Sequence, residues 1–169
     1  MNLKDHIRAV PDFPKPGILF YDISTLLAHP EAWNETVRQL KTALTPYHPS
    51  VLVGIESRGF LVAAPLAYAL GCGFVMVRKR GKLPGATIPY TYDLEYGTDC
   101  LEIHEDALRP GDRALVVDDV IATGGTAAAA GHLVRQLGAE LAGYAFLLEL
   151  TFLKGREKLQ GNVFSLIRY

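Results

Sequence analysis

The sequence predicts an α/β fold in which a mostly parallel central sheet is flanked by helices. Short apolar runs alternate with longer segments of helical periodicity, and this alternation is typical of parallel strands joined by crossover helices. The chain has 169 residues, of which 49% are hydrophobic and 21% charged, with no internal repeat. Size and composition therefore suit one domain, residues 1–169, with a single core.

Four apolar runs are predicted as strands: residues 51–55, 74–77, 114–119 and 141–150. Three segments are predicted as helices: residues 31–44, 59–71 and 124–138. Parallel sheets bind ligands beyond the carboxyl ends of their strands. The strand-to-helix turns at 55–60 and 118–126 are therefore the first candidates for a site.

Two segments lack periodicity. Residues 11–30 contain four prolines, which predicts an irregular segment laid over the surface as a small hood. Residues 79–112 are rich in Gly, Pro and Tyr and predict a long loop. Because loops of that length are usually functional, we expect residues 81–98 to form a flexible lid.

Net charge and cysteine content limit which partners and which cellular compartment the protein is expected to have. The net charge of −1 exerts no overall attraction on nucleic acid or an anionic membrane, so we expect a small-molecule substrate. Cys72 and Cys100 form no CxxC motif, and the N-terminus carries charges where a signal peptide has an apolar run. The longest apolar runs are shorter than the roughly 20 residues of a membrane helix. We expect a cytoplasmic protein.

The stretch "LVVDDVIATGGTA" is the most informative motif. It ends a predicted strand with Asp118 and Asp119, and burying an unpaired carboxylate is costly, so the pair should face water or a group that uses negative charge. Small side chains, free amides and two hydroxyls follow where a helix should begin, at Ala122, Thr123, Gly124, Gly125 and Thr126. These five residues predict a phosphate cradle. Neither the Walker pattern nor GxGxxG is present.

A ribose 5-phosphate fits this spacing, because its hydroxyls would reach the two carboxylates while its phosphate lies on the cradle. The stretch resembles the signature of the type I phosphoribosyltransferases, which bind phosphoribosyl pyrophosphate. Five further segments resemble the adenine-specific members of that family nearly end to end: "FPKPGILFYDIS", "ESRGF", "RKRGKLPG", "YDLEYG" and "ELTFLKGREKL". The resemblance implies the type I phosphoribosyltransferase fold and an enzyme of purine salvage, a homodimer that transfers the phosphoribosyl group to N9 of adenine with magnesium, giving AMP and pyrophosphate.

"ESRGF" follows a strand and opens a helix, so its amides and Arg58 can bind an anion. The resemblance makes Glu56, Ser57 and Arg58 a pyrophosphate loop, with a cis peptide expected between Glu56 and Ser57. "RKRGK" carries Arg78, Lys79, Arg80 and Lys82, and alone it fits a solvated loop or a weak nucleic-acid patch better than a binding site. Beside a substrate with three phosphate groups, these cations would neutralise the departing pyrophosphate. The resemblance leaves open whether Arg78 or Lys82 serves a neighbouring subunit.

The base pocket follows from the resemblance, since Phe20 alone would suit an ordinary core. Phe20 and Leu150 would stack on the two faces of the purine, while the backbone of Leu19 and Tyr21 reads its polar edge. A backbone carbonyl accepts from the 6-amino group of adenine, whereas a 6-oxo purine would oppose acceptor to acceptor. Family members commonly carry a basic residue where this chain has Tyr21, so the role of that side chain is open.

The lid would bring Tyr92, Glu95 and Tyr96 over the site and exclude water from an oxocarbenium-like centre. The resemblance makes Glu95 the acid/base group for the purine proton, although a solvated loop carboxylate is the alternative. Glu95, Arg58 and Asp118 form the expected catalytic set.

Magnesium prefers waters, phosphates and at most two carboxylates. We therefore expect no fixed protein metal site, and a magnesium ion carried by the substrate near Asp118 and Asp119.

Two other functions stay open. One is transfer to another nucleobase, which the base-pocket resemblance disfavours. The other is a non-catalytic regulator that senses phosphoribosyl pyrophosphate, for which we expect a DNA-binding element and find neither a spare helical domain nor net positive charge.

Overall fold

The computed structural model describes residues 1–94 and 96–169 and contains two sheets. A small antiparallel sheet pairs β1 (Arg8–Pro11) with β2 (Leu19–Asp22). A seven-stranded sheet has the order β5-β6-β4-β3-β7-β8-β9. Its strands are β3 (Val51–Ile55), β4 (Gly73–Lys79), β5 (Thr87–Asp93), β6 (Thr98–His104), β7 (Arg113–Ile121), β8 (Glu140–Glu149) and β9 (Val163–Arg168). The strands from β4 to β9 in this order are parallel, which confirms the predicted mostly parallel sheet.

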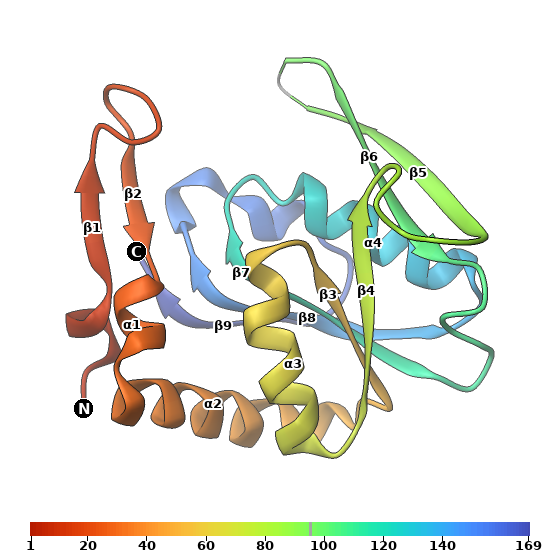
Figure 1. Ribbon diagram of the computed structural model, residues 1–169, viewed down its shortest axis with the longest axis horizontal. Helices are drawn as coiled ribbons and strands as arrows, with labels where there is room; N and C mark the ends of the chain where they lie inside the picture. Colours follow the sequence, from red (N-terminus) through yellow and green to blue (C-terminus); the bar gives the residue numbers. More distant parts are fainter. Residues whose placement is uncertain (95) are drawn as a thin grey trace.

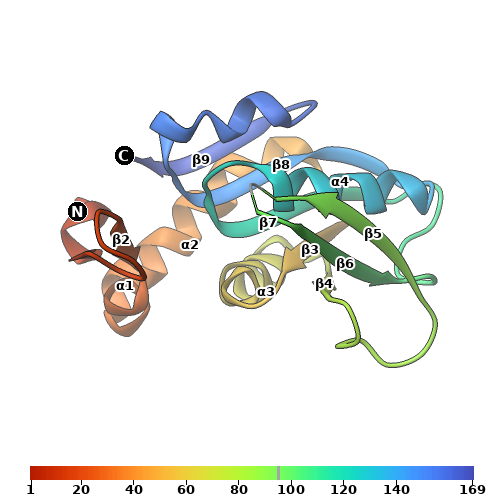
Figure 2. The ribbon, with the colours of Figure 1, turned by 90° about the horizontal axis from the view of Figure 1, so that it is seen from above.

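The α-helices are α1 (Ser24–Ala28), α2 (Pro30–Leu44), α3 (Arg58–Leu70) and α4 (Gly125–Gln136), and the 3-10 helices are η1 (Leu3–His6), η2 (Thr45–Tyr47), η3 (Thr151–Leu153) and η4 (Gly155–Lys158). Helices α2 and α3 pack on one face of the large sheet and α4 packs on the other (Figure 2). Successive strand residues serve opposite faces: Leu52 packs with α2 and α3, whereas Val53 packs with α4. Strands buried on both faces explain the continuous apolar runs in the sequence.

Two segments expected to be irregular contain regular structure, so those predictions were wrong. Residues 11–30 include β2 and α1, and residues 79–112 include the antiparallel hairpin of β5 and β6. Pro89 argues against a strand in the sequence, yet β5 lies at the edge of the sheet, where a missing N–H is tolerated. Strand β9 was not predicted either.

The carboxyl ends of β3, β7 and β8 lie at the same end of the sheet, between the β1–β2 and β5–β6 hairpins (Figure 1). Helix α3 starts soon after β3, and α4 starts soon after β7. Strand β7 continues to Ile121, so Asp118 and Asp119 lie within the strand and not at its end as predicted. In the described part of the chain, every helix is too short or too polar to cross a membrane.

Candidate active site

A pocket of about 470 Å³ opens at the carboxyl ends of these strands. It is lined by Ile18, Leu19, Phe20, Tyr21, Ile55, Glu56, Ser57, Arg58, Lys79, Asp118, Asp119, Val120, Ala122, Thr126 and Leu150. A smaller hollow of about 110 Å³ adjoins it, because Asp118, Val120, Ala122 and Thr126 line both. The combined space lies in the size range of small-molecule sites.

The phosphate cradle lies in the smaller hollow. Gly124 has a φ of +87° and immediately precedes α4, so the amides of the cradle point out of a helix N-terminus. A Cβ at Gly124 would collide with the carbonyl oxygen of Gly155, and a Cβ at Gly155 would collide with that of Ala122. The start of η4 therefore supports the back of the cradle.

The two carboxylates have different environments. Asp119 is only 5% exposed, and its Oδ2 accepts a 2.6 Å hydrogen bond from Nε of Arg58. Asp118 Oδ1 accepts the backbone amide of Asp119 at 2.8 Å. Burial and the neighbouring charge of Asp119 raise the pKa of Asp118 well above its ordinary value. A hydroxyl donor or a cation beside Asp118 would favour its ionised form.

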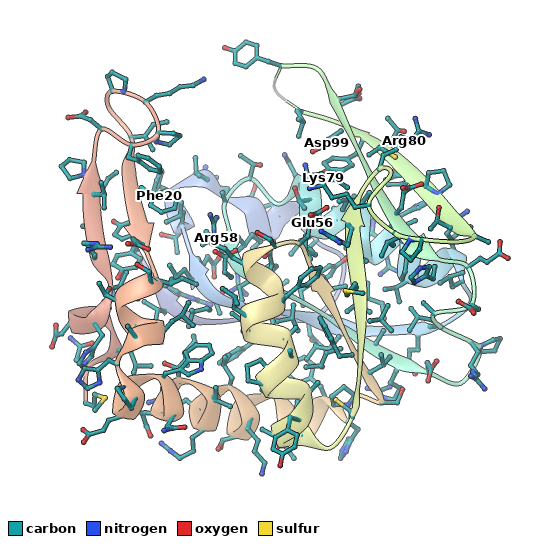
Figure 3. All side chains as sticks on the ribbon, viewed as in Figure 1. Phe20, Glu56, Arg58, Lys79, Arg80 and Asp99 are labelled. Carbon is teal, nitrogen blue, oxygen red and sulfur yellow. The ribbon has the colours of Figure 1, made fainter. Side chains whose placement is uncertain are left out.

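Arg58 also reaches the base side of the pocket. Its guanidinium carbon lies 5.5 Å from the centroid of the Phe20 ring, within cation–π distance. Figure 3 shows Phe20 pointing from β2 toward Arg58 at the start of α3. The side chain thus spans the carboxylate and base regions in this structure.

Glu56 lies at the centre of a cationic cluster. Its carboxylate accepts the amide of Lys79 and lies 3.3 Å from Arg78 Nη2 and 3.6 Å from Lys82 Nζ. Burial opposes ionisation, but the Lys79 amide and the Lys82 and Arg78 charges outweigh it and lower the pKa of Glu56. The Nε of Arg78 is buried and has no hydrogen-bond partner among the described residues. The cis peptide expected between Glu56 and Ser57 is present.

The structure brings the predicted base residues together from distant parts of the chain. Leu19, Phe20 and Tyr21 of β2 line the same pocket as Leu150, which follows β8. The amide of Leu150 donates to the carbonyl of Ile121 at 3.0 Å, so this wall of the pocket is attached to the end of β7.

The predicted lid residues are only partly placed at the site. Tyr92 of β5 has its hydroxyl 3.2 Å from Thr126 Oγ1, so the hairpin contacts the cradle. Tyr96 is 90% exposed and does not line the pocket. Glu95 lies outside the described residues.

A protein metal cage of three or more His, Cys, Asp or Glu side chains is not found within residues 1–94 and 96–169. Asp118 and Asp119 are the two carboxylates beside the cradle, and Asp119 is already paired with Arg58. This donor set fits an ion that keeps waters and substrate oxygens as its main ligands.

A family model described as a phosphoribosyl transferase domain matches residues 22–165. An adenine phosphoribosyltransferase from Rhodospirillum centenum is 65% identical over all of this chain and 99% of its own length. The chain belongs to the adenine phosphoribosyltransferase family.

Solved adenine phosphoribosyltransferases have the same fold. The enzyme from Thermoanaerobacter pseudethanolicus superposes with a TM-score of 0.96 at 50% identity, covering 99% of this chain and 98% of that one. The Saccharomyces cerevisiae enzyme, complexed with adenine and an imino-altritol bisphosphate, gives 0.94 at 48% identity, covering 97% and 96%. The type I phosphoribosyltransferase fold predicted from the sequence is confirmed.

Four lining residues of this adenine phosphoribosyltransferase family member were not singled out from the sequence: Ile18, Ile55, Lys79 and Val120. Lys79, which the sequence indicated only as one cation of the basic stretch, pairs with Asp99 of β6. Gly155 supports the cradle from the far end of the chain. Only a long-range contact reveals that role, and no local pattern marks it.

Proposed function

We propose that the protein transfers the phosphoribosyl group of 5-phospho-α-D-ribose 1-diphosphate to N9 of adenine, giving AMP and pyrophosphate in purine salvage. One observation carries the proposal: two adjoining hollows bring together the predicted phosphate cradle, the carboxylate pair and the apolar base walls, one region for each part of AMP. The yeast relative, solved with adenine, supports the choice of base.

In this reaction, the amides of Ala122 to Thr126 hold the 5-phosphate at the N-terminus of α4. Asp118 and Asp119 accept hydrogen bonds from the 2- and 3-hydroxyls of the ribose. The ribose then has its anomeric carbon directed toward the base walls. The raised pKa of Asp118 is consistent with a carboxylate that acquires its partners only when the sugar binds.

The diphosphate lies on the loop from Glu56 to Arg58 at the N-terminus of α3. Arg78 and Lys82, which contact Glu56 in this structure, exchange part of that contact for the leaving pyrophosphate. Among residues 1–94 and 96–169, no group accepts from the buried Nε of Arg78, which supports a ligand contact for this side chain because a buried donor requires a partner. Magnesium bound with the diphosphate near Asp118 and Asp119 supplies further neutralisation of its charge.

Adenine lies between Phe20 and Leu150, with the backbone of Leu19 and Tyr21 reading its 6-amino edge. N9 forms a bond to the anomeric carbon as the bond to the diphosphate oxygen breaks. The proton on N9 passes to the lid carboxylate Glu95. Arg58 stabilises the negative charge of the departing pyrophosphate.

Residues 81–98, with Tyr92 and Tyr96, serve as the lid, and residues 11–30 serve as the hood of a single domain, residues 1–169. Closure of the lid excludes water from the anomeric carbon. The contact between Tyr92 and Thr126 supports a lid that is connected to the cradle.

We further propose that the protein acts as a homodimer in the cytoplasm. Leu61 and Tyr68 of α3 and Phe74 and Met76 of the neighbouring β4 expose apolar surface that a second copy would cover. Free Cys72 and Cys100 suit a reducing compartment. Light scattering on the purified protein tests the dimer, and a monomeric mass at micromolar concentration contradicts it.

The activity is tested by incubating the protein with magnesium, phosphoribosyl pyrophosphate and each of adenine, hypoxanthine, guanine and xanthine. Chromatography follows nucleotide and pyrophosphate. Magnesium-dependent AMP formation with adenine alone supports the proposal. Turnover with another base contradicts the assigned base pocket, and an absence of turnover with every base contradicts an enzymatic role.

A further inference from the structure

The strand that reads the base is not part of the large sheet. Leu19, Phe20 and Tyr21 belong to β2, whose strand partner is β1 in the separate two-stranded sheet. Figure 1 shows this hairpin standing beside the body of the protein, next to the C-terminus. The position of β2 relative to Leu150 on the opposite wall is therefore set by packing outside the large sheet, which includes the buried Ile23 and Leu26 that follow β2 and the contacts of the side chains of β2 itself.

Tyr21 makes such a contact with the last residue of the chain. The rings of Tyr21 and Tyr169 stack with their centroids 3.8 Å apart and an interplanar angle of 19°. The Nζ of Lys4 lies 4.6 Å from the centroid of the Tyr169 ring. Since successive side chains of a strand point to opposite faces, Phe20 can face the pocket while Tyr21 packs on Tyr169.

Tyr169 is in turn attached to the residues on either side of Leu150. Its amide donates to the carbonyl of Glu149 at 3.0 Å. Its carbonyl accepts the amide of Thr151 at 3.0 Å and the hydroxyl of Thr151 at 2.7 Å. The chain of contacts thus runs from β2 through two aromatic rings to the loop that carries Leu150.

We propose that the stacked pair of Tyr21 and Tyr169 is a positioning element that sets the spacing of the two walls of the adenine site. The proposal rests on the function proposed above and assigns a role to the aromatic side chain at position 21. Ring stacking, and not a charge at this position, then aligns the backbone of Leu19 and Tyr21 with the 6-amino edge of the base. The phosphate cradle, Ala122 to Thr126 at the start of α4, lies on other elements than the stacked pair.

The test compares Tyr21→Ala and Tyr169→Ala with Tyr21→Phe and Tyr169→Phe, using the kcat and the two KM values for AMP formation. Aromatic pairs contribute an effect of about 2- to 13-fold in an equilibrium constant. We expect each Ala variant to raise the KM for adenine by about this factor and to leave the KM for phosphoribosyl pyrophosphate within about twofold. The Phe variants should retain the wild-type KM for adenine, because they keep the rings.

The double variant Tyr21→Ala with Tyr169→Ala should be no worse than either single variant, because both remove the same contact. Phe152→Ala is the matched control, since Phe152 is an aromatic residue of η3 that is 69% exposed. A wild-type KM for adenine in both Ala variants overturns the proposal. Additive single effects, equal increases in both KM values, or Phe variants as impaired as the Ala variants overturn it as well.

The wild-type protein separates this proposal from the proposed function. If the wild type forms no AMP from adenine, the proposed function fails. If the wild type is active and the variants show none of the expected changes in the KM for adenine, the positioning role alone fails.

Discussion

Gly155→Ala tests whether the start of η4 shapes the phosphate cradle. The added methyl carbon would collide with the carbonyl oxygen of Ala122, and it would lie 3.0 Å from both the amide nitrogen of Gly124 and Cγ1 of Ile121. Two of these three neighbours are backbone atoms, which cannot rotate away. The cradle or η4 must therefore move.

The size of the effect follows from that overlap. Restoring ordinary contacts of about 3.5 Å requires a shift on the order of 1 Å. A displacement of about 1 Å at a reacting site costs roughly 100-fold in rate, and overpacking costs about 1–3 kcal/mol of stability. We expect kcat/KM for phosphoribosyl pyrophosphate to fall by about 100-fold, with a decrease in Tm of roughly 2–12 °C.

The assay is AMP formation at saturating adenine with varied phosphoribosyl pyrophosphate. Gly73→Ala is the matched control, because a Cβ there would meet its nearest neighbour, Val51 Cγ2, at an ordinary 3.7 Å. Gly73→Ala should keep wild-type kinetics. A folded Gly155→Ala protein with an unchanged kcat/KM for phosphoribosyl pyrophosphate would refute the inference that Gly155 supports the cradle.

Three further predictions concern charged residues. Asp118→Asn removes a charge-assisted hydrogen bond to the ribose worth roughly 1.5–3 kcal/mol, so kcat/KM for phosphoribosyl pyrophosphate should fall by about 10- to 150-fold. An unchanged kcat/KM would contradict a contact between Asp118 and the substrate. Arg78→Ala should raise the KM for phosphoribosyl pyrophosphate about tenfold or more, because Arg78 contacts Glu56 of the pyrophosphate loop. Arg80→Ala, at an exposed position, should leave this KM unchanged, and equal effects of the two substitutions would contradict a specific contact. Hydrogen bonds from Arg156, reinforced by the charges around it, lower the pKa of Glu149 from 4.5 to about 2. The ionised carboxylate therefore contributes on the order of 3 kcal/mol to the free energy of unfolding above about pH 4.5. This contribution is lost as the pH falls toward 2. Urea unfolding should show Glu149→Gln less stable than the wild type at pH 7 and the difference shrinking below pH 4.5, and a gap independent of pH would contradict this linkage.

The elements with strong periodicity were predictable because their burial pattern is local. Residues 51–55 form β3 as predicted, and the predicted helix of residues 31–44 is α2, which starts at Pro30. The hairpin of β5 and β6 was missed although its strands alternate. Ile88, Tyr90 and Tyr92 of β5 pack against the core that contains Leu101 and Ile103 of β6. Pro89 and the Gly- and Pro-rich surroundings obscured this alternation in the sequence.

The residues of the candidate site also differ in how far the sequence could predict them. The carboxylates and the cradle are contiguous, so their chemistry could be inferred from one stretch, "LVVDDVIATGGTA". Lys79 could not be distinguished from its basic neighbours, because only the paired strands show which side chain enters the pocket. Sequence alone also assigned the base walls only through resemblance, since Phe20 and Leu150 lie 130 positions apart.

The α/β class, the parallel core strands and the proposed phosphate cradle could be predicted from the sequence, because each depends on residues close together in the chain. Three contacts are visible only in the folded structure: Arg58 pairs with Asp119, Gly155 lies behind the cradle, and Tyr21 stacks on Tyr169. Each of these contacts joins segments that are distant in sequence. Their geometry depends on how the strands and helices pack, and no local pattern of residues contains that information.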